Sequence, residues 1–336
     1  MFNYVTNTTF AEIADRIRAA GHVALITHSK PDGDAVGSQL ALRRALSALG
    51  KRVTLYAMGP IERSLITVAG ETPMRQAEDD PPYDDHDLLL IVDTGAWSQL
   101  EPLAQWIRQR HDLAVVLDHH VHGDDVAALR IVDSNAAAAA TLVIRLLDEL
   151  GYELTGGVGS VAEALFFALA TDTGWFRFAN ANADAFALAA RLMEAGIDNS
   201  RLYQISEESF EPSRLAVEAR ALSSLEYALD GRAAFQFLRL EDLKETGASV
   251  EELTGLVNNP MSVGTVRISI LLAETEPGRT KVSFRSKPPL DDGLWIDVNE
   301  LAGQLNGGGH AHAAGARLPC GIDEAARIVR RTLEEL

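Results

Sequence analysis

The sequence predicts an α/β protein, with a doubly wound parallel-sheet domain followed by a smaller mixed α/β domain. In the first half, short unbroken apolar segments alternate with amphipathic ones, which is typical of parallel strands covered on both faces by helices. In the second half, two apolar segments flank the turn sequence EPGR, which predicts an antiparallel hairpin. The chain has 336 residues, a length that accommodates two domains of ordinary size.

The elements of the first half follow from its apolar runs. Runs of strand length predict strands at 23–27, 52–58, 87–95, 113–120 and 129–134. Apolar residues at helical spacing predict helices at 38–50, 135–151 and 160–174. The second of these helices begins with five alanines, which we interpret as a helix start rather than as low-complexity sequence.

The second half begins after a helical connection. Residues 184–229 are polar and helical in pattern, without a strong strand signal. Strands are then predicted at 233–240, 263–274 and 280–287, and an amphipathic helix at 323–336. We therefore expect a catalytic domain at 1–190, a helical linker at 191–228 and a substrate-binding domain at 229–336.

The composition excludes several classes of protein. The formal net charge is −18 at pH 7, which argues against a broad basic face for duplex nucleic acid. No apolar run reaches the roughly 18 residues that a membrane span needs, and the N-terminus lacks the pattern of a secretory signal. The single cysteine, Cys320, fits a reducing compartment. We expect a cytoplasmic protein that binds neither duplex nucleic acid nor membranes.

Histidines and aspartates follow four of the apolar segments. In chain order they are His28, Asp32 and Asp34 after the first strand, Asp93 after LLLIV, Asp118, His119 and His120 in VVLDHH, and Asp172 at the end of an apolar helix. Ligands of an open parallel sheet bind beyond the carboxyl ends of its strands, so we expect these side chains to converge. Carboxylates gathered in this way repel one another unless cations lie between them.

The residue types indicate which cations such a centre would bind. Oxygen and imidazole ligands without cysteine suit Mn²⁺ or Mg²⁺ better than structural zinc. The ligands are too many for one ion, whereas two ions about 3.5–4 Å apart that share an aspartate could use them all. A water between two such ions is a nucleophile near neutral pH, so the pattern favours phosphoester hydrolysis.

Each cluster also has an ordinary interpretation when it is taken alone. PDGD is typical of a turn, VDTG of a helix cap and DHH of surface histidines. The occurrence of all the clusters in one domain, each after an apolar segment, favours the metal centre.

The clusters resemble, in order, the motifs of the DHH phosphoesterase superfamily: HSKPDGDAVGS, VDTG, DHH and ATDTG. The resemblance implies two metal sites. One site is formed by His28, Asp32 and Asp93, and the other by Asp34, Asp93, His119 and Asp172. Asp93 would therefore bridge the two ions.

The same resemblance implies roles for residues beside the ligands. Catalytic roles fall to Asp93, His120 and Asp118: His120 faces the substrate phosphate, and Asp118 orients the neighbouring histidine. Gly37 and Ser38 are expected to open the next helix. Their backbone N–H groups could hold an anion, or Ser38 could be a simple N-cap.

The second half resembles the DHHA1 module through GGGHAHAAGA at 307–316. Consecutive glycines let backbone N–H groups approach a phosphate, although such a run can also be a flexible turn. Arginine can bind two phosphate oxygens at once. The substrate-binding residues implied are Arg285, Ser286, Gly307, Gly308, Gly309 and His310. The family often has a fourth glycine where this chain has Asn306.

Together the two modules resemble the NrnA-type branch, bacterial nanoRNases that degrade very short RNA and often dephosphorylate 3′-phosphoadenosine 5′-phosphate (pAp). The resemblance implies a two-metal phosphodiesterase, with two Mn²⁺ or Mg²⁺ ions, that cleaves short oligoribonucleotides such as pApA to mononucleotides. It also implies pAp phosphatase activity and a homodimer. The alternatives are an enzyme specific for pAp or for cyclic dinucleotides, an inorganic pyrophosphatase and a non-catalytic nucleotide sensor.

Overall fold

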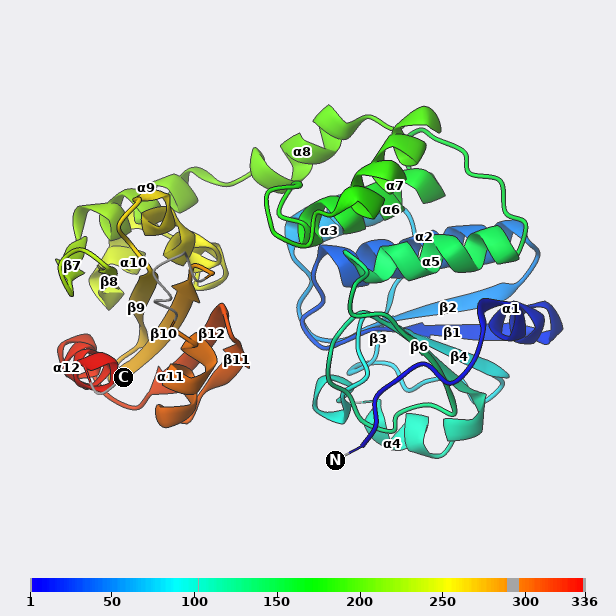
Figure 1. Ribbon diagram of the computed structural model, residues 1–336, viewed down its shortest axis with the longest axis horizontal. Helices are drawn as coiled ribbons and strands as arrows, with labels where there is room; N and C mark the ends of the chain where they lie inside the picture. The colour runs from blue at the N-terminus through cyan, green and yellow to red at the C-terminus, as the bar shows by residue number, and fades with distance from the viewer. Residues whose placement is uncertain (1, 102, 289–295, 335–336) are drawn as a thin grey trace. The chain divides into compact units, whose positions relative to one another are not determined.

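The protein consists of two compact units, Met1–Ser209 and Phe210–Leu336 (Figure 1). The computed structural model describes residues 2–101, 103–288 and 296–334, without the side chains of residues 310 and 334. Each unit contains one six-stranded sheet.

The sheet of the first unit is parallel throughout, as the unbroken apolar runs predict. Its strands lie in the order β3-β2-β1-β4-β5-β6. They are β1 (His22–Ile26), β2 (Arg52–Ala57), β3 (Arg75–Gln76), β4 (Leu88–Val92), β5 (Ala114–Asp118) and β6 (Leu129–Val132). The direction of strand succession reverses between β1 and β4, which is where doubly wound folds bind their ligands.

Helices cover both faces of this sheet. They are α1 (Phe10–Ala19), α2 (Gly33–Ala48), α3 (Arg63–Ala69), α4 (Ala104–Arg108), α5 (Ala139–Glu149), α6 (Val161–Asp172), α7 (Ala183–Glu194) and α8 (Asn199–Glu207), with short 3₁₀ turns at η1 (Trp97–Gln99) and η2 (His111–Leu113). Figure 1 shows α2 and α5 against one face, α6 and α7 beyond them, and α4 on the other face. Alternate β1 residues accordingly enter two cores, Val23 and Leu25 on one side and Ala24 and Ile26 on the other.

Two helix starts differ from the sequence prediction. Helix α2 begins at Gly33 rather than at 38, because the Asp32 carboxylate accepts the Ala35 N–H (3.1 Å) and caps the helix. Gly37 and Ser38 therefore lie inside α2, and the expectation that they open the helix or cap it is wrong. Helix α5 begins at Ala139, so most of the alanine run precedes it.

The second unit has a mixed sheet in the order β11-β12-β10-β9-β8-β7. Its strands are β7 (Glu226–Ala228), β8 (Ala233–Leu238), β9 (Ile268–Glu276), β10 (Arg279–Ser286), β11 (Gly308–His310) and β12 (Ala313–Leu318). Its helices are α9 (Pro212–Ser223), α10 (Leu240–Thr246), α11 (Val298–Gln304) and α12 (Ile322–Glu334), with 3₁₀ turns at η3 (Glu251–Leu253) and η4 (Leu256–Ser262). Strands β9 and β10 form the predicted antiparallel hairpin, whereas β8 and β9 are parallel. The two-part α/β fold class is confirmed.

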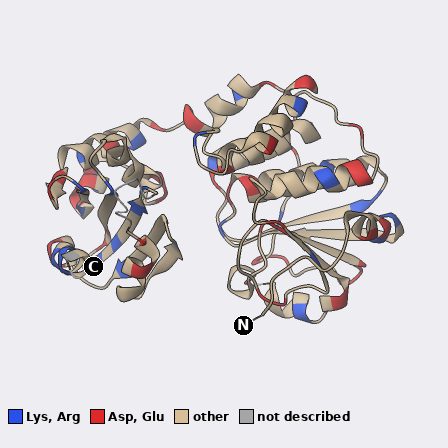
Figure 2. Ribbon diagram, viewed as in Figure 1, with Lys and Arg blue, Asp and Glu red and all other residues tan. Residues whose placement is uncertain are grey.

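Charged residues of both signs are interspersed over the two units (Figure 2). Within the described part of the chain, every helix is too short or too polar to cross a bilayer.

Candidate metal centre

The predicted ligands of the first unit gather at the carboxyl ends of β1, β4 and β5. His28 follows β1, Asp93 follows β4, and His119 follows β5. The two helices that pack together beside them contribute Asp34 from the first turn of α2 and Asp172 from the last turn of α6. The centre therefore lies at the switch point between β1 and β4.

Asp93 lies between two histidines. Its Oδ1 atom is 3.3 Å from His119 Nε2, and its Oδ2 atom is 3.5 Å from His28 Nε2. The side chain is 3% exposed, and Oδ1 is buried without a hydrogen-bond partner. A buried carboxylate oxygen that lacks a donor is costly, and a cation placed between it and the imidazole would remove that cost. Asp93 thus has one oxygen available to each of two neighbouring ligand groups.

The outer nitrogens of the two histidines are held by backbone carbonyls. His28 Nδ1 lies 3.1 Å from the Ser29 carbonyl, and His119 Nδ1 lies 3.3 Å from the Ala136 carbonyl. A carbonyl accepts only from a protonated nitrogen, so these contacts fix the tautomer and leave Nε2 facing Asp93. Metal-binding histidines are commonly oriented in this way.

Three groups of side chains bring their ligand atoms close enough together to hold a metal ion. They are His28 with Asp32 and Asp93, Asp34 with His119 and Asp172, and Asp93 with His119 and His120. The first two groups contain six of the side chains that the sequence singles out, and Asp93 stands beside both. The oxygen and imidazole donors suit Mn²⁺ or Mg²⁺.

The side chains of the centre have strongly displaced pKa values. Burial and the nearby charges of Asp93 and Asp172 raise the pKa of Asp34 well above its usual value. Burial raises the pKa of Asp172 to about 6, and the charge of Asp93 contributes in the same direction. Negative charge is thus in excess at the centre, as expected where cations belong.

Protons on His119 and His28 balance part of that negative charge. Burial lowers the pKa of His119, but contact with Asp93 and the charge of Asp34 outweigh it and raise the pKa to about 10. Burial likewise lowers the pKa of His28, and contacts with Asp93 and Asp32 raise it to about 9. A divalent cation could take the place of these imidazolium protons.

Backbone groups of the alanine run contact two residues of the centre, Asp34 and His119. The backbone N–H groups of Ala139 and Ala140 donate to the Asp34 carboxylate at 2.6 and 3.0 Å, and Ser38 Oγ donates to it at 3.2 Å. The Ala136 carbonyl meanwhile orients His119. All five alanines of the run are buried. The run therefore contributes backbone contacts to the site, and only its last two residues belong to α5.

His120 is held by its neighbour Asp118. His120 Nδ1 lies 2.7 Å from Asp118 Oδ1, and the His120 backbone N–H donates to the same oxygen at 3.2 Å. Although His120 belongs to the third group of possible ligands, this hydrogen bond occupies Nδ1. An Nδ1 held by an acceptor is also found at His28 and His119, so the role expected for His120 beside the metals stays a prediction.

Two residues at the centre were missed by the sequence analysis. Asn180 Nδ2 donates to Asp172 Oδ2 (3.1 Å) and to the Ala137 carbonyl (2.9 Å), so it positions a predicted ligand. The Tyr4 hydroxyl donates to Asp118 Oδ2 at 2.5 Å. Neither residue belongs to a periodic pattern or a motif, so the sequence carries no local signal for them.

The predicted substrate-binding residues of the second unit lie on the two strands that flank β12, or just before one of them. Arg285 and Ser286 end β10, and Gly308, Gly309 and His310 form β11. Arg285 is half-buried, and burial lowers its pKa. It donates to the Phe284 carbonyl (2.9 Å), and no carboxylate of the described residues forms an ion pair with it. The His310 side chain lies outside the described part of the chain.

The glycine run has a packing role alongside the expected one. A Cβ atom on Gly307 would lie 2.2 Å from the Gly315 carbonyl oxygen, and one on Gly309 would lie 2.4 Å from that of Ala313. A Cβ atom on Gly308 would have more space, because it would lie 3.8 Å from Asn299 Oδ1. Asn306, where the family often has glycine, adopts φ +56°, a conformation that asparagine tolerates better than most residues.

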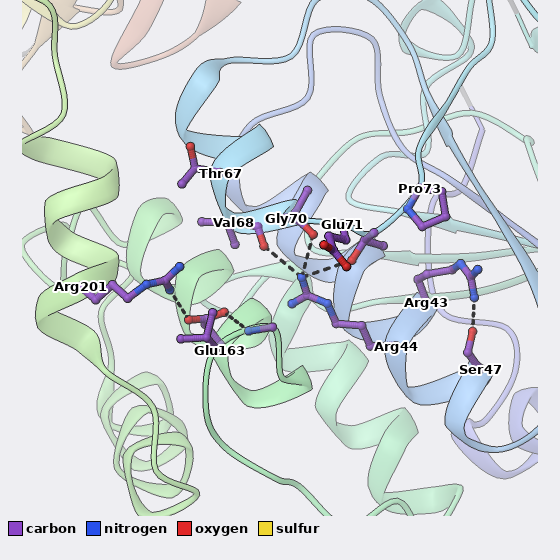
Figure 3. A pocket seen from close by; sticks show the side chains of 14 residues that line it. Arg43, Arg44, Ser47, Thr67, Val68, Gly70, Glu71, Pro73, Glu163 and Arg201 are labelled. Atoms are coloured by element: carbon purple, nitrogen blue, oxygen red, sulfur yellow. Dashed lines mark hydrogen bonds and ion pairs between the residues drawn. The ribbon is translucent and has the colours of Figure 1, made fainter.

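A cavity of about 610 Å³ lies elsewhere in the first unit, among α2, α3, α6 and α8 (Figure 3). Arg44 donates there to the carbonyls of Ser160 and Val68, both at 3.0 Å, and Arg201 pairs with Glu163 at 2.5 Å. None of the predicted ligands lines this cavity. We therefore place the candidate site at the strand ends.

The fold and the site define the class of protein: a doubly wound α/β domain with carboxylates and imidazoles that could hold metal ions at its switch point, followed by a mixed α/β domain. The family model described as "DHH family, N-terminal domain" matches residues 22–170, and that described as "DHHA1 domain" matches residues 230–335. The chain belongs to this DHH/DHHA1 family, as the sequence motifs predicted.

Curated relatives match over nearly the whole chain. A Thermus thermophilus protein named bifunctional oligoribonuclease and PAP phosphatase NrnA is 30% identical over 330 residues, which are 96% of this chain and 93% of the relative. The Bacillus subtilis protein of the same name is 27% identical, with 91% and 92% covered.

Solved structures share the fold. An exopolyphosphatase-related protein from Bacteroides fragilis superposes with a TM-score of 0.89 at 24% identity, covering 99% of this chain and 98% of that one. The exonuclease RecJ bound to manganese gives a TM-score of 0.50 at 19% identity, covering 100% of this chain and 96% of that one.

Proposed function

We propose that the protein is a metal-dependent phosphoesterase that hydrolyses short oligoribonucleotides to mononucleotides and removes a phosphate from pAp. The observation that carries the proposal is Asp93, whose two oxygens face the Nε2 atoms of His28 and His119. The names of the Thermus and Bacillus relatives support the substrate class.

The residues present fit two divalent cations. His28, Asp32 and Asp93 would hold one of them, and Asp34, Asp93, His119 and Asp172 the other. Such cations, when bound, neutralise phosphate charge and make water a nucleophile near neutral pH. Manganese is our first candidate, with magnesium as the alternative.

The chain's own residues would orient the substrate. Contact with Asp118 raises the pKa of His120, and the ring that carries a proton on both nitrogens can donate to Asp118 from Nδ1 and to a phosphate oxygen from its opposite side. In the second unit, Arg285 offers a guanidinium that lacks a described acidic partner. We propose that Arg285, Ser286 and the Gly307–His310 segment bind the part of the substrate away from the reacting phosphate.

One assay panel with Mn²⁺ tests the proposal. The substrates are pApA, a five-nucleotide RNA, pAp, cyclic di-AMP and pyrophosphate. We expect turnover of pApA and pAp, slower turnover of the longer RNA, and loss of all activity on exhaustive chelation with recovery when Mn²⁺ is restored. Full activity after chelation would rule out metal dependence.

The same panel separates the alternatives. Turnover of pAp or cyclic di-AMP alone would indicate a narrower enzyme than proposed, and turnover of pyrophosphate alone would indicate a pyrophosphatase. Binding without turnover of any substrate would indicate a nucleotide sensor.

A further inference from the structure

A hydrogen-bonded chain connects the N-terminal segment to the candidate catalytic histidine. The Tyr4 side chain is buried, and its hydroxyl donates to Asp118 Oδ2 at 2.5 Å. The other oxygen of Asp118 lies 2.7 Å from His120 Nδ1 and accepts the His120 backbone N–H. Asp118 is fully buried, so its orientation depends on these contacts.

Two glycines leave space for the Tyr4 side chain. A Cβ atom on Gly95 would lie 1.9 Å from the Tyr4 hydroxyl oxygen, and one on Gly123 would lie 2.5 Å from the ring. These glycines belong to the loops that follow β4 and β5, so the loops that carry the centre are shaped around the Tyr4 ring.

The segment that carries Tyr4 is anchored beside β6. The Thr6 hydroxyl donates to the Val132 carbonyl at 2.9 Å, and the Asn7 backbone N–H donates to the Arg130 carbonyl at 3.0 Å. Arg130 in turn donates to the Val5 carbonyl at 3.1 Å. These contacts fix the three residues that follow Tyr4, and they thereby hold Tyr4 in place.

The chemistry of the chain assigns a direction to each bond. Burial and the adjacent Asp118 carboxylate raise the pKa of Tyr4, so the phenol keeps its proton and acts as the donor. An ionised carboxylate has no proton to donate, so His120 Nδ1 must carry the hydrogen that faces it. The ring angle of His120 is then fixed, with Nδ1 facing Asp118 and Nε2 turned away from it.

We propose that Tyr4 is a positioning residue for catalysis, which acts through Asp118 to fix the orientation of His120. This inference deepens the proposed function and rests on it, because it takes His120 to contact the substrate phosphate. The competing explanation is that Tyr4 only fills space and stabilises the fold.

The first test is an epistasis experiment on pApA hydrolysis with saturating Mn²⁺. Tyr4→Phe keeps the ring against Gly95 and Gly123 and removes only the hydroxyl. Loss of an outer partner of this kind typically costs on the order of 10-fold in activity, and we expect roughly that loss in kcat/KM with unchanged metal content. In a His120→Ala background, the same change should alter kcat/KM less than about twofold, because the residue through which it acts is gone.

Tyr152→Phe is the matched control, since Tyr152 is a partly buried tyrosine that follows the end of α5 remote from Asp34. It should leave kcat/KM unchanged. If Tyr4→Phe is as active as wild type, or costs as much without His120 as with it, the positioning role is wrong.

The second test does not need activity. In ¹⁵N-histidine-labelled protein with diamagnetic Mg²⁺, the ring signals of His120 are identified by their loss in His120→Ala. Tyr4→Phe should shift the Nδ1 resonance and speed exchange of its proton, whereas Tyr152→Phe should not. An unchanged His120 signal in Tyr4→Phe would overturn the proposal. If the wild type hydrolyses no phosphoester but the His120 signal shifts as expected, the proposed function fails while the positioning contact stands.

Discussion

Asp93 adopts a backbone conformation that aspartate seldom takes. Its φ is +61°, in the left-handed region, and its side chain is almost fully buried between His28 and His119. Such a conformation persists where the surroundings enforce it, often at functional sites. Burial raises the pKa of Asp93, but contacts with His119 and His28 outweigh it and lower the pKa to about 2. Asp93 therefore stays ionised and available to cations.

Asp93→Asn should remove the charge that both ions share while keeping the volume and the left-handed backbone, which asparagine tolerates. We expect a loss of at least about 10³-fold in kcat on pApA, or about 4 kcal/mol on the barrier. Steady-state kinetics measures kcat, and metal analysis of the same samples measures the metal content. Asp148→Asn, which breaks a surface pair with Arg191, is the control and should stay near wild type. Activity within tenfold of wild type at unchanged metal content would refute the bridging role.

The displaced pKa values predict how metal binding depends on pH. With folded pKa values of about 9 and 10, His28 and His119 carry protons at pH 7 in the metal-free protein, whereas Asp172, at about 6, is mostly ionised. Loading both sites at pH 7 should therefore release protons from both histidines. Mn²⁺ affinity should fall as the pH falls from 8 to 6, because the protons that the metal must displace compete more strongly at lower pH.

Calorimetry in buffers of different ionisation enthalpy counts the released protons. A binding enthalpy that is independent of the buffer would show that metal displaces no protons. The thermal stabilisation by Mn²⁺ should also be larger at pH 8 than at pH 6, because tighter binding to the folded state adds more stability.

At the scale of elements, the close packing of α2 on α6 sets the distance between two candidate ligands. Helix α2 carries Asp34 and α6 carries Asp172. A Cβ atom on Gly37 would lie 2.6 Å from the Ala164 carbonyl oxygen and 2.8 Å from Ala168 Cβ. The helices approach this closely only because position 37 lacks a side chain.

Gly37→Ala should push the two helices apart. We expect a loss of about 1–3 kcal/mol in the free energy of unfolding, together with weaker Mn²⁺ binding. Denaturant melts with and without Mn²⁺ measure both effects. Gly303→Ala in α11 is the control, since nothing lies within 4 Å of its Cβ position, and it should be neutral or slightly stabilising. Equal stability of the two variants would show that the α2–α6 contact tolerates a methyl group.

The sequence predicts β1, β4 and β5 well because each is a short apolar run whose residues are all buried. It misses β3, which consists of two half-buried polar residues, Arg75 and Gln76. It misplaces the start of α2, because Asp32 serves both as a helix cap and as a candidate ligand, and the ligand interpretation obscured the cap. Asn180 and Tyr4 lie outside any motif, and only the folded chain brings them to Asp172 and Asp118. The motifs identify the candidate ligands. The residues that orient these ligands come close to them only through tertiary contacts, so no motif identifies them.

At the scale of the whole molecule, we expect the two units to have different functions. The first unit contains the candidate metal ligands, and the second contains a half-buried guanidinium, Arg285, at the end of the inner strand β10. A metal centre recognises phosphate in any ester, so it cannot by itself select a short oligonucleotide. We expect the second unit to supply the selection.

Arg285→Ala should therefore impair oligonucleotide hydrolysis without affecting the metals. A charge-assisted contact to phosphate is worth about 1.5–3 kcal/mol, so kcat/KM on pApA should fall roughly 10- to 150-fold. A small non-nucleotide phosphodiester should be hydrolysed nearly as well as by wild type. Arg279→Ala, which removes an exposed arginine of the same strand, is the control. Equal losses on the small ester and on pApA would mean that Arg285 does not select the substrate.

Anomalous diffraction from crystals grown with Mn²⁺ tests directly whether two cations share Asp93. We predict two manganese peaks about 3.5–4 Å apart, each in contact with one oxygen of Asp93, with His28 beside one ion and His119 beside the other. A single peak, or peaks that do not contact Asp93, would contradict the two-metal centre.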